Sequence, residues 1–553
     1  MSSLKIFPLG GMGRVTQNMF LYEVNNEILI VDCGIGFPDV YMPGVDAIIP
    51  DISYLLKQVE AGKKIVGMIL SHGHDDHIAA TPYLLPDLPD FPIYASPLTV
   101  GFAHQRLRDQ NIDKEIKVVA DSKTVKLSDN FDFRLINLTH SVPDTRHIAI
   151  RTPAGLIYHG SDFKIDKNPI DGVMTDLDMI KQIGEEGVLL MAIDCLRVER
   201  QTWTKSESAV GPAIEKEIET TKGKFVVTLM SSHLHRIQQV VNIAQKHNRK
   251  VVFIGRSVEQ NVKVAMDLGK LEIPRSILVD KKYLNDYQDK DLCVVIAGSQ
   301  GQEGSSMVRA VYGEHRIVQI RQDDKVIFSA DVIPGNEVPY YNAIDELASN
   351  GIKVIYPAIA PDVHQSGHAS SVEQKELVNL VKPKFVMPIG GQDRHRALFR
   401  EFVTDDLGYT KQQVLTPKTG QILNFAEGKF KAIDQIKLNP SIVDGLGIGD
   451  VGPIVLSDRL ALSKAGIVVV VIPSRKGRLN LQDISVISRG FVFMREAEEV
   501  VDFIKAETIQ VIKKLGKKPS YDEVKRKVER KLSRKLYKII KREPMIVPVI
   551  MES

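Results

Sequence analysis

The chain has 553 residues, of which 43% are hydrophobic and 25% charged, and its formal net charge at pH 7 is only +3. A chain of this length exceeds one hydrophobic core, so we expect two or three domains. The composition is ordinary for a soluble globular protein, and the apolar run at 467–473 is far too short to cross a bilayer. Widely spaced cysteines without a CxxC motif, and a first segment unlike a signal peptide, indicate a cytoplasmic protein.

Residues 4–200 alternate short β-rich runs with loops and a few helical stretches, a pattern typical of a layered α/β domain. The expected strands are 28–31, 64–70, 131–138, 147–151, 156–158 and 189–193. From about 208, strands at 225–229, 251–254 and 292–297 each lead into a helix, which predicts a doubly wound unit with a parallel sheet. Because metal-type motifs resume after about 355, we interpret this unit as an insertion.

A last segment begins near 450. It predicts a strand at 466–472, a helix at 496–515, a break at 516–520, a second helix, and a strand at 545–551. In the second helix Val524, Val528, Leu532, Leu536 and Ile540 recur every four residues, which leaves Lys and Arg on the other faces. That basic surface either follows RNA phosphates or is simply a solvated face.

Imidazoles and carboxylates are most concentrated at residues 71–77, directly after the apolar run 65–70, which predicts a buried strand. Three histidines and two aspartates at a strand end are too costly to desolvate as packing residues. They are suitable ligands for zinc or a similar metal, and there are more of them than one ion needs. The pattern therefore predicts a two-metal hydrolase, with a solvated polar turn as the alternative.

Later strands deliver further groups of the same kind. His140 follows the strand at 135–138, Asp162 follows 156–158, and Asp194 follows 189–193. A single His or Asp at a strand end is more often a cap or turn residue. Their recurrence beside the 71–77 cluster favours metal ligation.

This set of residues resembles the metallo-β-lactamase superfamily, and further stretches are similar to its β-CASP nucleases and to the ribonuclease J family. These stretches are 231–239, 298–301, 334–337, 366–370 and 443–450. The resemblance implies an α/β fold: a metallo-β-lactamase αββα sandwich with an inserted doubly wound β-CASP domain and a small α+β C-terminal domain for self-association. The expected boundaries are 1–207 and 356–440 for the sandwich, 208–355 for the insertion and 450–553 for the last domain.

The resemblance also implies roles for individual residues. His72, His74 and His140 would hold one zinc ion and Asp76 and His77 the other, with Asp162 bridging; Mn²⁺ or Mg²⁺ would substitute. Asp75 would act in the outer shell, and Asp32 would orient a ligand histidine. Asp194 and His368 match the first and second β-CASP motifs and complete the catalytic set, with His368 donating a proton to the leaving oxygen.

Gly390 departs from the family pattern. Ribonucleases J carry a histidine in this third β-CASP motif, where it contacts the second metal, whereas a glycine cannot ligate. We therefore expect a weaker second metal site. Gln392 and His395 are close in sequence, but nothing in the sequence places them at the metal.

Loops at two strand-to-helix junctions are candidates for the substrate site. Ser370 followed by Glu373 predicts a capping box, and free N–H groups at a helix start attract anions. The resemblance implies a pocket here for the 5′ end of RNA, although two ordinary helix caps would have the same sequence pattern. The candidate residues are Ser232, His233, His235, Arg236, His364, Gln365, Ser366, Gly367 and His368.

The leading interpretation is a cytoplasmic zinc-dependent ribonuclease that degrades 5′-monophosphorylated, single-stranded RNA from the 5′ end, also cuts internally, and takes part in mRNA decay and rRNA maturation. We expect a homodimer or homotetramer, with a paralogous subunit as a further candidate partner and no membrane association. The alternative is a poorly active RNA-binding or structural subunit paired with a catalytic paralogue, prompted by Gly390. A hydrolase of small esters or thioesters is disfavoured by the β-CASP-like motifs.

Overall fold

The computed structural model describes residues 3–39, 41–121, 123–445, 447–491, 497–516 and 519–552. Leu446 of the 443–450 motif, residue 496 of the expected helix and residues 517 and 518 of the expected break lie outside these ranges. The chain divides into two compact units. The first contains residues up to Phe37 together with Ile48–Ser441, and the second combines Pro38–Ala47 with residues from Ile442 onwards.

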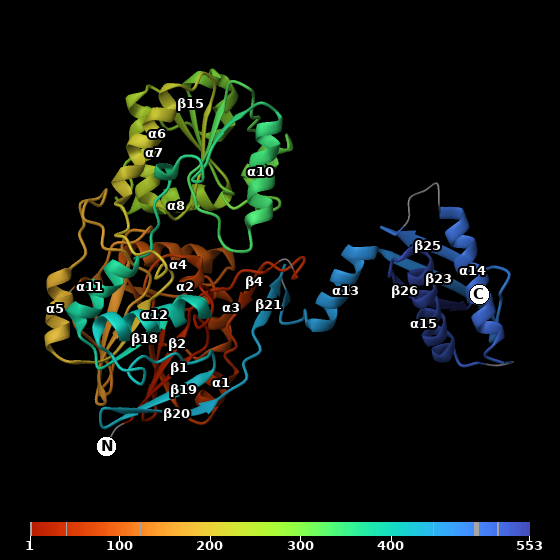
Figure 1. The fold of residues 1–553 in the computed structure, drawn as a ribbon, viewed down its shortest axis with the longest axis horizontal. Helices are drawn as coiled ribbons and strands as arrows, with labels where there is room; N and C mark the ends of the chain where they lie inside the picture. The colour runs from red at the N-terminus through yellow and green to blue at the C-terminus, as the bar shows by residue number, and fades with distance from the viewer. Residues whose placement is uncertain are drawn as a thin grey trace. The chain divides into compact units, whose positions relative to one another are not determined.

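A sandwich of two sheets forms the lower part of the first unit in Figure 1, among the described residues. The first sheet has the order β20 (Lys429–Gln435), β19 (Gln421–Ala426), β1 (Leu4–Pro8), β2 (Phe20–Val24), β3 (Glu27–Val31), β5 (Lys64–Ile69), β6 (Ile93–Ala95) and β7 (Ile116–Val118). The second has the order β18 (Phe385–Ile389), β12 (Val188–Asp194), β11 (Gly155–His159), β10 (Arg146–Thr152), β9 (Asp132–Asn137) and β8 (Val125–Lys126).

The core of the sandwich lies between these sheets. Phe20, Tyr22 and Val31 of the first sheet and Phe133 and Ile150 of the second belong to one buried apolar cluster. β3 is buried on both faces from Ile28 onwards and is continuously apolar there, whereas β9 alternates and keeps Asp132 and Arg134 on its less buried face.

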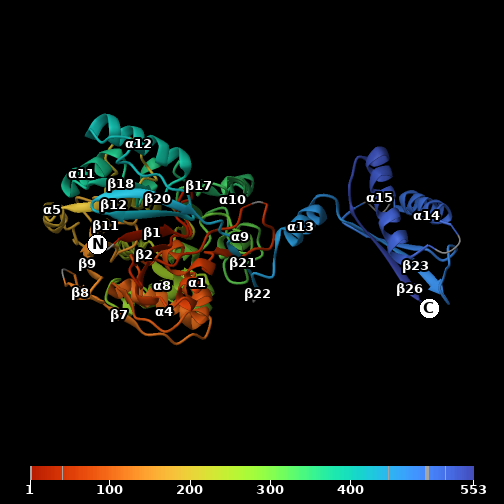
Figure 2. The ribbon, with the colours of Figure 1, turned by 90° about the horizontal axis from the view of Figure 1, so that it is seen from below.

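Helices cover the outer faces of the sandwich, and Figure 2 shows α11 and α12 on one side of the strands and α1 and α4 on the other. These helices are α1 (Ser53–Glu60), α2 (Asp75–Ile78), α3 (Thr81–Leu84), α4 (Pro97–Asp109), α5 (Leu177–Glu185), α11 (Ser371–Val381) and α12 (Asp393–Leu407). Apolar residues of α5, α11 and α12 pack on the outer face of the second sheet.

The inserted part of the first unit is a parallel sheet between helices (Figure 1). Its strands have the order β14 (Lys250–Ile254), β15 (Leu292–Ile296), β13 (Phe225–Thr228), β16 (Lys325–Phe328) and β17 (Lys353–Ile355). Its helices are α6 (Val210–Glu219), α7 (Leu234–Lys246), α8 (Arg256–Asp267), α9 (Ser306–Val311) and α10 (Glu337–Ser349). The predicted doubly wound unit is confirmed.

The second unit is an α+β domain. Its sheet contains β24 (Arg478–Leu479), β23 (Ile467–Arg475), β25 (Ser485–Arg489) and β26 (Met545–Glu552), and its helices are α13 (Pro453–Ala465), α14 (Ala497–Lys513) and α15 (Tyr521–Ile540). Val524, Val528, Leu532 and Leu536 are buried against the sheet, as their spacing predicts. Residues 38–47 join this unit, since the N–H of Asp46 donates to the carbonyl of Val443 (2.9 Å). The sequence did not predict that residues 38–47 belong to the second unit.

The remaining short elements are β4 (Ala47–Ile49), β21 (Ser441–Asp444), β22 (Gly447–Ile448) and 3₁₀ turns at Leu85–Asp87, Glu207–Ala209, Lys281–Asp286, Asp289–Asp291 and Pro361–Val363. No described helix combines the length and the apolar character that crossing a bilayer requires.

Candidate metal centre

The predicted metal ligands come from the ends of neighbouring strands. The 71–77 cluster follows β5 and includes α2, His140 follows β9, Asp162 follows β11 and Asp194 ends β12. Because β5 is in the first sheet and the others are in the second, the site bridges the two sheets of the sandwich at one edge. The buried strands fix the backbone there, so the ligand side chains are held without a flexible loop.

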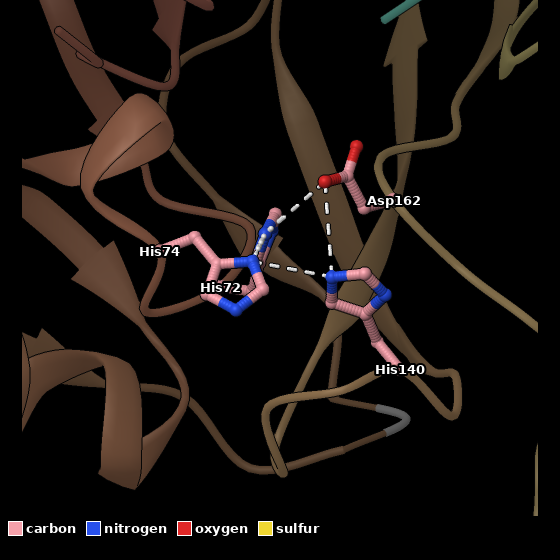
Figure 3. A group of neighbouring side chains, drawn as sticks. All are labelled: His72, His74, His140 and Asp162. Carbon is pink, nitrogen blue, oxygen red and sulfur yellow. Dashed lines mark hydrogen bonds and ion pairs between the residues drawn. The ribbon is translucent and has the colours of Figure 1, made fainter. Parts of the chain in front are cut away.

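Three imidazole nitrogens and one carboxylate oxygen point toward a common centre (Figure 3). His72 Nε2 and His140 Nε2 lie 3.1 Å and 3.2 Å from His74 Nδ1. Both are also 3.7 Å from Asp162 Oδ2. Such a set of three nitrogens and one oxygen is the donor set of a four-coordinate zinc or similar ion.

Protons alone do not account for this packing. His140 Nδ1 lies 2.7 Å from the carbonyl oxygen of Gly367 and donates to it, so Nε2 of the neutral ring presents a lone pair to its neighbours. Burial lowers the pKa of His72 and His140 well below the usual value, and lowers the pKa of His74 to about 3. The rings are therefore neutral, and a proton between two of them cannot satisfy all the lone pairs. A cation at the centre does.

A second group of ligand atoms uses the same carboxylate. His77 Nε2 lies 3.6 Å from Asp162 Oδ2 and 3.8 Å from Asp76 Oδ2. Burial and the neighbouring Asp162 raise the pKa of Asp76 to about 6, because two buried carboxylates repel each other. A cation between them removes that repulsion, and Asp162 is placed to serve both groups.

Asp32 fixes the orientation of His77. Its Oδ2 lies 2.7 Å from His77 Nδ1 and accepts the Ser71 hydroxyl (2.9 Å), while its Oδ1 accepts the backbone N–H of Ser71 (2.7 Å). Asp32 has a left-handed backbone conformation, with φ of 61° directly after β3, which aims its carboxylate under the histidine. This geometry agrees with the orienting role expected for Asp32.

His368 and Asp194 adjoin the shared carboxylate. His368 Nδ1 lies 2.8 Å from Asp194 Oδ2, and its Nε2 lies 3.9 Å from Asp162 Oδ2. Burial opposes the charged form of His368, but Asp194 and Asp162 outweigh it and raise the pKa of His368 to about 9. The imidazole therefore carries a proton on the nitrogen that faces the metal ligands.

Asp75 and His159 point elsewhere. The Asp75 carboxylate accepts a hydrogen bond from Arg106 Nε (2.8 Å) and belongs to none of the converging groups of ligand atoms among the described residues. His159, which precedes Asp162 closely, has its Nδ1 2.6 Å from the Tyr22 hydroxyl. Neither contributes a ligand atom to the centre.

Gly390 faces the second group of ligands. A Cβ atom at this position would lie 3.5 Å from Asp194 Oδ1 and 3.7 Å from Asp162 Oδ1. The nearby candidates do not replace a side chain there, because His395 Nδ1 accepts the N–H of Gln392 (3.3 Å) at the start of α12 and the Gln392 side chain bonds to Arg394. The glycine therefore offers no side chain beside Asp162, the carboxylate that the two groups share.

The loops expected to bind the RNA 5′ end meet beside His368, but Arg236 is already engaged. Its guanidinium donates twice to Glu207 (2.8 Å each) and also to the carbonyls of Ser329 (2.7 Å) and Gln365 (2.9 Å). His364 Nδ1 accepts from it as well (2.7 Å). Arg236 thus ties the insertion to the 364–368 loop and does not face an open pocket.

The other candidates in these loops divide into engaged and available groups. The Ser366 hydroxyl accepts the N–H of His368 (3.1 Å), and the Gly367 carbonyl holds His140. His235 pairs with Asp171 (3.1 Å), Gln365 Nε2 lies 3.5 Å from Asp362, and Ser232 is buried. His233 lies 3.4 Å from Glu207 Oε2, yet neither of its ring nitrogens has a hydrogen-bond partner among the described residues.

The start of α11 differs from the sequence expectation in one respect. Glu373 accepts the N–H of Ser370 (3.0 Å), as the predicted capping box requires. However, the N–H groups of Ala369 and Ser371 also have acceptors, in the carbonyls of Phe163 and Arg200. The N–H groups of Ala369, Ser370 and Ser371 are therefore not free for an anion.

Several supporting residues were not found from the sequence. Asn18 Nδ2 lies 3.0 Å from His77 Nε2, and the Ser161 hydroxyl lies 3.3 Å from His72 Nδ1. Glu207 is fully buried because it pairs with Arg236, and this pairing is visible only in the structure. Ser161 stands next to Asp162 in sequence, which was the one available signal.

Comparison with known proteins gives matches along the whole chain. Family models match residues 222–347 ("Ribonuclease J, beta-CASP domain"), 454–553 ("Ribonuclease J C-terminal domain") and 12–155 ("Metallo-beta-lactamase superfamily"). The chain is 33% identical to Ribonuclease J of Thermus thermophilus, over 99% of this chain and 95% of that protein. It is 31% identical to Ribonuclease J 2 of Staphylococcus aureus strain MRSA252, over 99% and 98% of the two chains.

A solved structure shares the fold at low identity. A protein of unknown function from Enterococcus faecalis V583 matches with a TM-score of 0.53 and 14% identity, over 76% of this chain and 99% of that one. At that identity the likeness concerns the fold alone.

Asp162→Asn tests whether one carboxylate serves both ligand groups. We expect metal affinity to fall at least about 10- to 100-fold, because loss of a direct ligand should exceed the effect of losing a supporting residue. Metal analysis after dialysis of the purified protein measures this. Asp129→Asn is the control, since its exposed carboxylate pairs with Lys126 away from the metal centre and should not affect metal content. Equal metal content in the two variants would contradict the shared ligand.

Glu207→Gln tests the structural role of Arg236. The substitution leaves a buried guanidinium without its countercharge, so we expect the free energy of unfolding to fall by about 3–5 kcal/mol. Urea denaturation of the full chain measures the change. Glu185→Gln, at an exposed pair with Lys181, is the matched control and should have no measurable effect. A stability loss no greater than in the control would show that Arg236 is free for another role.

Proposed function

The chain belongs to the ribonuclease J family of metallo-β-lactamase-fold nucleases, and on this premise we propose that it is a zinc-dependent ribonuclease that degrades 5′-monophosphorylated RNA from the 5′ end and also cuts internally. The observation that carries the proposal is the convergence of both ligand groups and His368 on Asp162. We further propose a place in mRNA decay and rRNA maturation, as the family likeness implies.

The residues of the centre divide the work of phosphodiester hydrolysis. Divalent cations held by the two groups would promote ionisation of water and offset the charge that develops on the attacked phosphate. Asp194 orients His368, whose Nε2 faces the shared carboxylate and is placed to donate a proton to the departing 3′ oxygen. Asp32 and Ser71 hold the ligand histidines in their reactive orientation.

The donor sets support zinc more strongly at one position than at the other. Three imidazoles and a carboxylate form a donor set that suits zinc. The second group offers one imidazole and two carboxylates, a set that Mn²⁺ or Mg²⁺ accepts as well. We therefore propose two ions, with the second bound more weakly because Gly390 provides no ligand.

Recognition of the RNA 5′ end is proposed for the loops beside His368. His233 is buried, and the contact of its Nε2 with Glu207 Oε2 is 3.4 Å long, so a phosphate that reaches this loop would compete for its ring N–H. Ser232, Ser366 and Gly367 complete the surroundings, while Arg236, His235, His364 and Gln365 hold these loops in place. A phosphate anchored here would set the distance to the scissile bond and so favour removal of one nucleotide at a time.

A poorly active RNA-binding or structural subunit is the alternative, and Gly390 is the observation that favours it. In that case a catalytic paralogue would supply the activity. For the leading proposal we expect single-stranded RNA as substrate and self-association through the C-terminal domain as a homodimer or homotetramer. The buried free cysteines Cys33, Cys195 and Cys293 support a reducing, cytoplasmic setting.

The direct test uses RNA labelled at the 5′ end and carrying either a monophosphate or a triphosphate. With zinc or manganese, we expect labelled mononucleotide chiefly from the monophosphorylated RNA. His74→Ala should lower the rate at least about 100-fold, because it removes a direct ligand. RNA binding without cleavage in the unmodified protein would reject the nuclease proposal and favour the structural subunit. Equal rates on both RNAs would reject 5′-monophosphate recognition.

Gly390→His tests the weak second site, with Gly390→Ala as the matched control. Both variants place a side chain at a φ of 65° and so share a backbone strain of about 1 kcal/mol. Only histidine adds a ligand, so we expect the His variant to retain more metal after dialysis than the Ala variant. Two ions retained tightly by the unmodified protein, or equal retention in the two variants, would contradict a weakened site.

A further inference from the structure

A large cavity in the first unit lies outside the metal centre. Its volume is about 930 Å³, within the usual range for small-molecule sites. Its walls are α12, the loop that follows β1, the turn before β19 and the segment that follows β20. Figure 2 shows α12 beside β18, which it contacts, on this side of the sandwich. None of the metal-ligand residues lines the cavity.

The cavity carries an excess of positive charge. Its basic residues are Arg14, Arg396, Arg400, Lys411, Lys418 and Lys437, and its acidic residues are Asp393 and Glu401. Asp393 is paired with Arg396 (3.1 Å). Among the described residues, no ion pair involves any of the three lysines, Arg14 or Arg400. Positive charges that outnumber the negative ones around one space favour an anion there.

Buried donors without partners line the same space. Gln17 and Arg396 are 3% and 4% exposed, and Nε2 of Gln17 and Nε of Arg396 have no hydrogen-bond partner in the described part of the chain. Nε of Arg400 is also unpartnered there. Native proteins rarely leave buried donors unpaired, so these groups indicate a missing acceptor.

The chemistry of the lining selects the class of ligand. Guanidinium, ammonium and amide donors together match the oxygens of a phosphate group. No aromatic residue lines the cavity, so base stacking does not contribute and the base is not read. We propose that this cavity is a second, base-independent binding site for phosphate groups, carried either by a free nucleoside phosphate or by a bound RNA strand.

The site adjoins the metal centre without being part of it. Gln17 is followed by Asn18, whose amide lies 3.0 Å from His77 Nε2. The carbonyl of Gly11, on the same loop, accepts the N–H of Gly390 (3.2 Å). The loop after β1 therefore has the cavity on one side and the second ligand group on the other.

Lysine footprinting on the full chain tests the site without relying on catalysis. The protein is acetylated alone, with adenosine 5′-monophosphate, or with a single-stranded RNA that ends in a 5′-hydroxyl, and each lysine is followed by mass spectrometry. The exposed Lys411, Lys418 and Lys437 report on the cavity, and Lys216 and Lys222 are exposed reference lysines. A double variant, Arg400→Gln with Lys418→Gln, is compared with the control pair Lys216→Gln and Lys222→Gln in binding titrations.

We expect acetylation of the cavity lysines, but not of the reference lysines, to slow several-fold with ligand. The cavity variant should bind the protecting ligand at least about tenfold more weakly than the control pair does. Protection by the mononucleotide identifies a free nucleoside phosphate, and protection by RNA alone identifies a bound strand. No protection by either ligand, or equal affinity of the two double variants, overturns the proposal. These readouts do not use cleavage, so they remain informative if the proposed ribonuclease activity fails.

Discussion

One carboxylate oxygen, Asp162 Oδ2, lies within 3.6–3.9 Å of the ring nitrogens of His72, His77, His140 and His368. Burial makes this arrangement expensive unless positive charge resides among these groups. Protons meet that need only in part, since burial lowers the pKa of His72, His74 and His140, whereas the neighbouring carboxylates outweigh burial and raise the pKa of His77 and His368. Cations bound by the two ligand groups that share Asp162 would supply the remaining positive charge, and the other contacts of the centre serve to hold these ligands.

The fold places these residues together by ending strands from both sheets at one edge of the sandwich. β12 is apolar up to its terminal Asp194, and β9 turns its apolar residues Phe133 and Leu135 into the core, so packing of the core fixes the ligand positions at the strand ends. Supporting contacts then orient each ring, as Asp32 does for His77 and the Gly367 carbonyl does for His140. Rigid strands with short polar ends provide the preorganisation that metal sites need.

Much of the fold was predictable because its patterns are local. Continuous apolar runs predicted the strands, and the four-residue spacing from Val524 to Leu536 predicted the buried face of α15. The fold class is confirmed, and the ligands from distant strand ends meet as the family likeness implied. What the sequence could not give depends on tertiary neighbours: the Glu207 partner of Arg236, the engaged N–H groups at α11, and the excursion of residues 38–47. The basic cavity is of the same kind, because its residues come from four separate segments.

Anomalous diffraction at the zinc edge, from crystals of the full chain grown with zinc, tests the shared carboxylate most directly. A peak within about 2.0–2.2 Å of Asp162 Oδ2 and of the nitrogens of His72, His74 and His140 is the predicted result. A second, weaker peak is expected between Asp162, Asp76 and His77. Zinc bound only elsewhere, or in contact with the histidines but not with Asp162, would contradict the account.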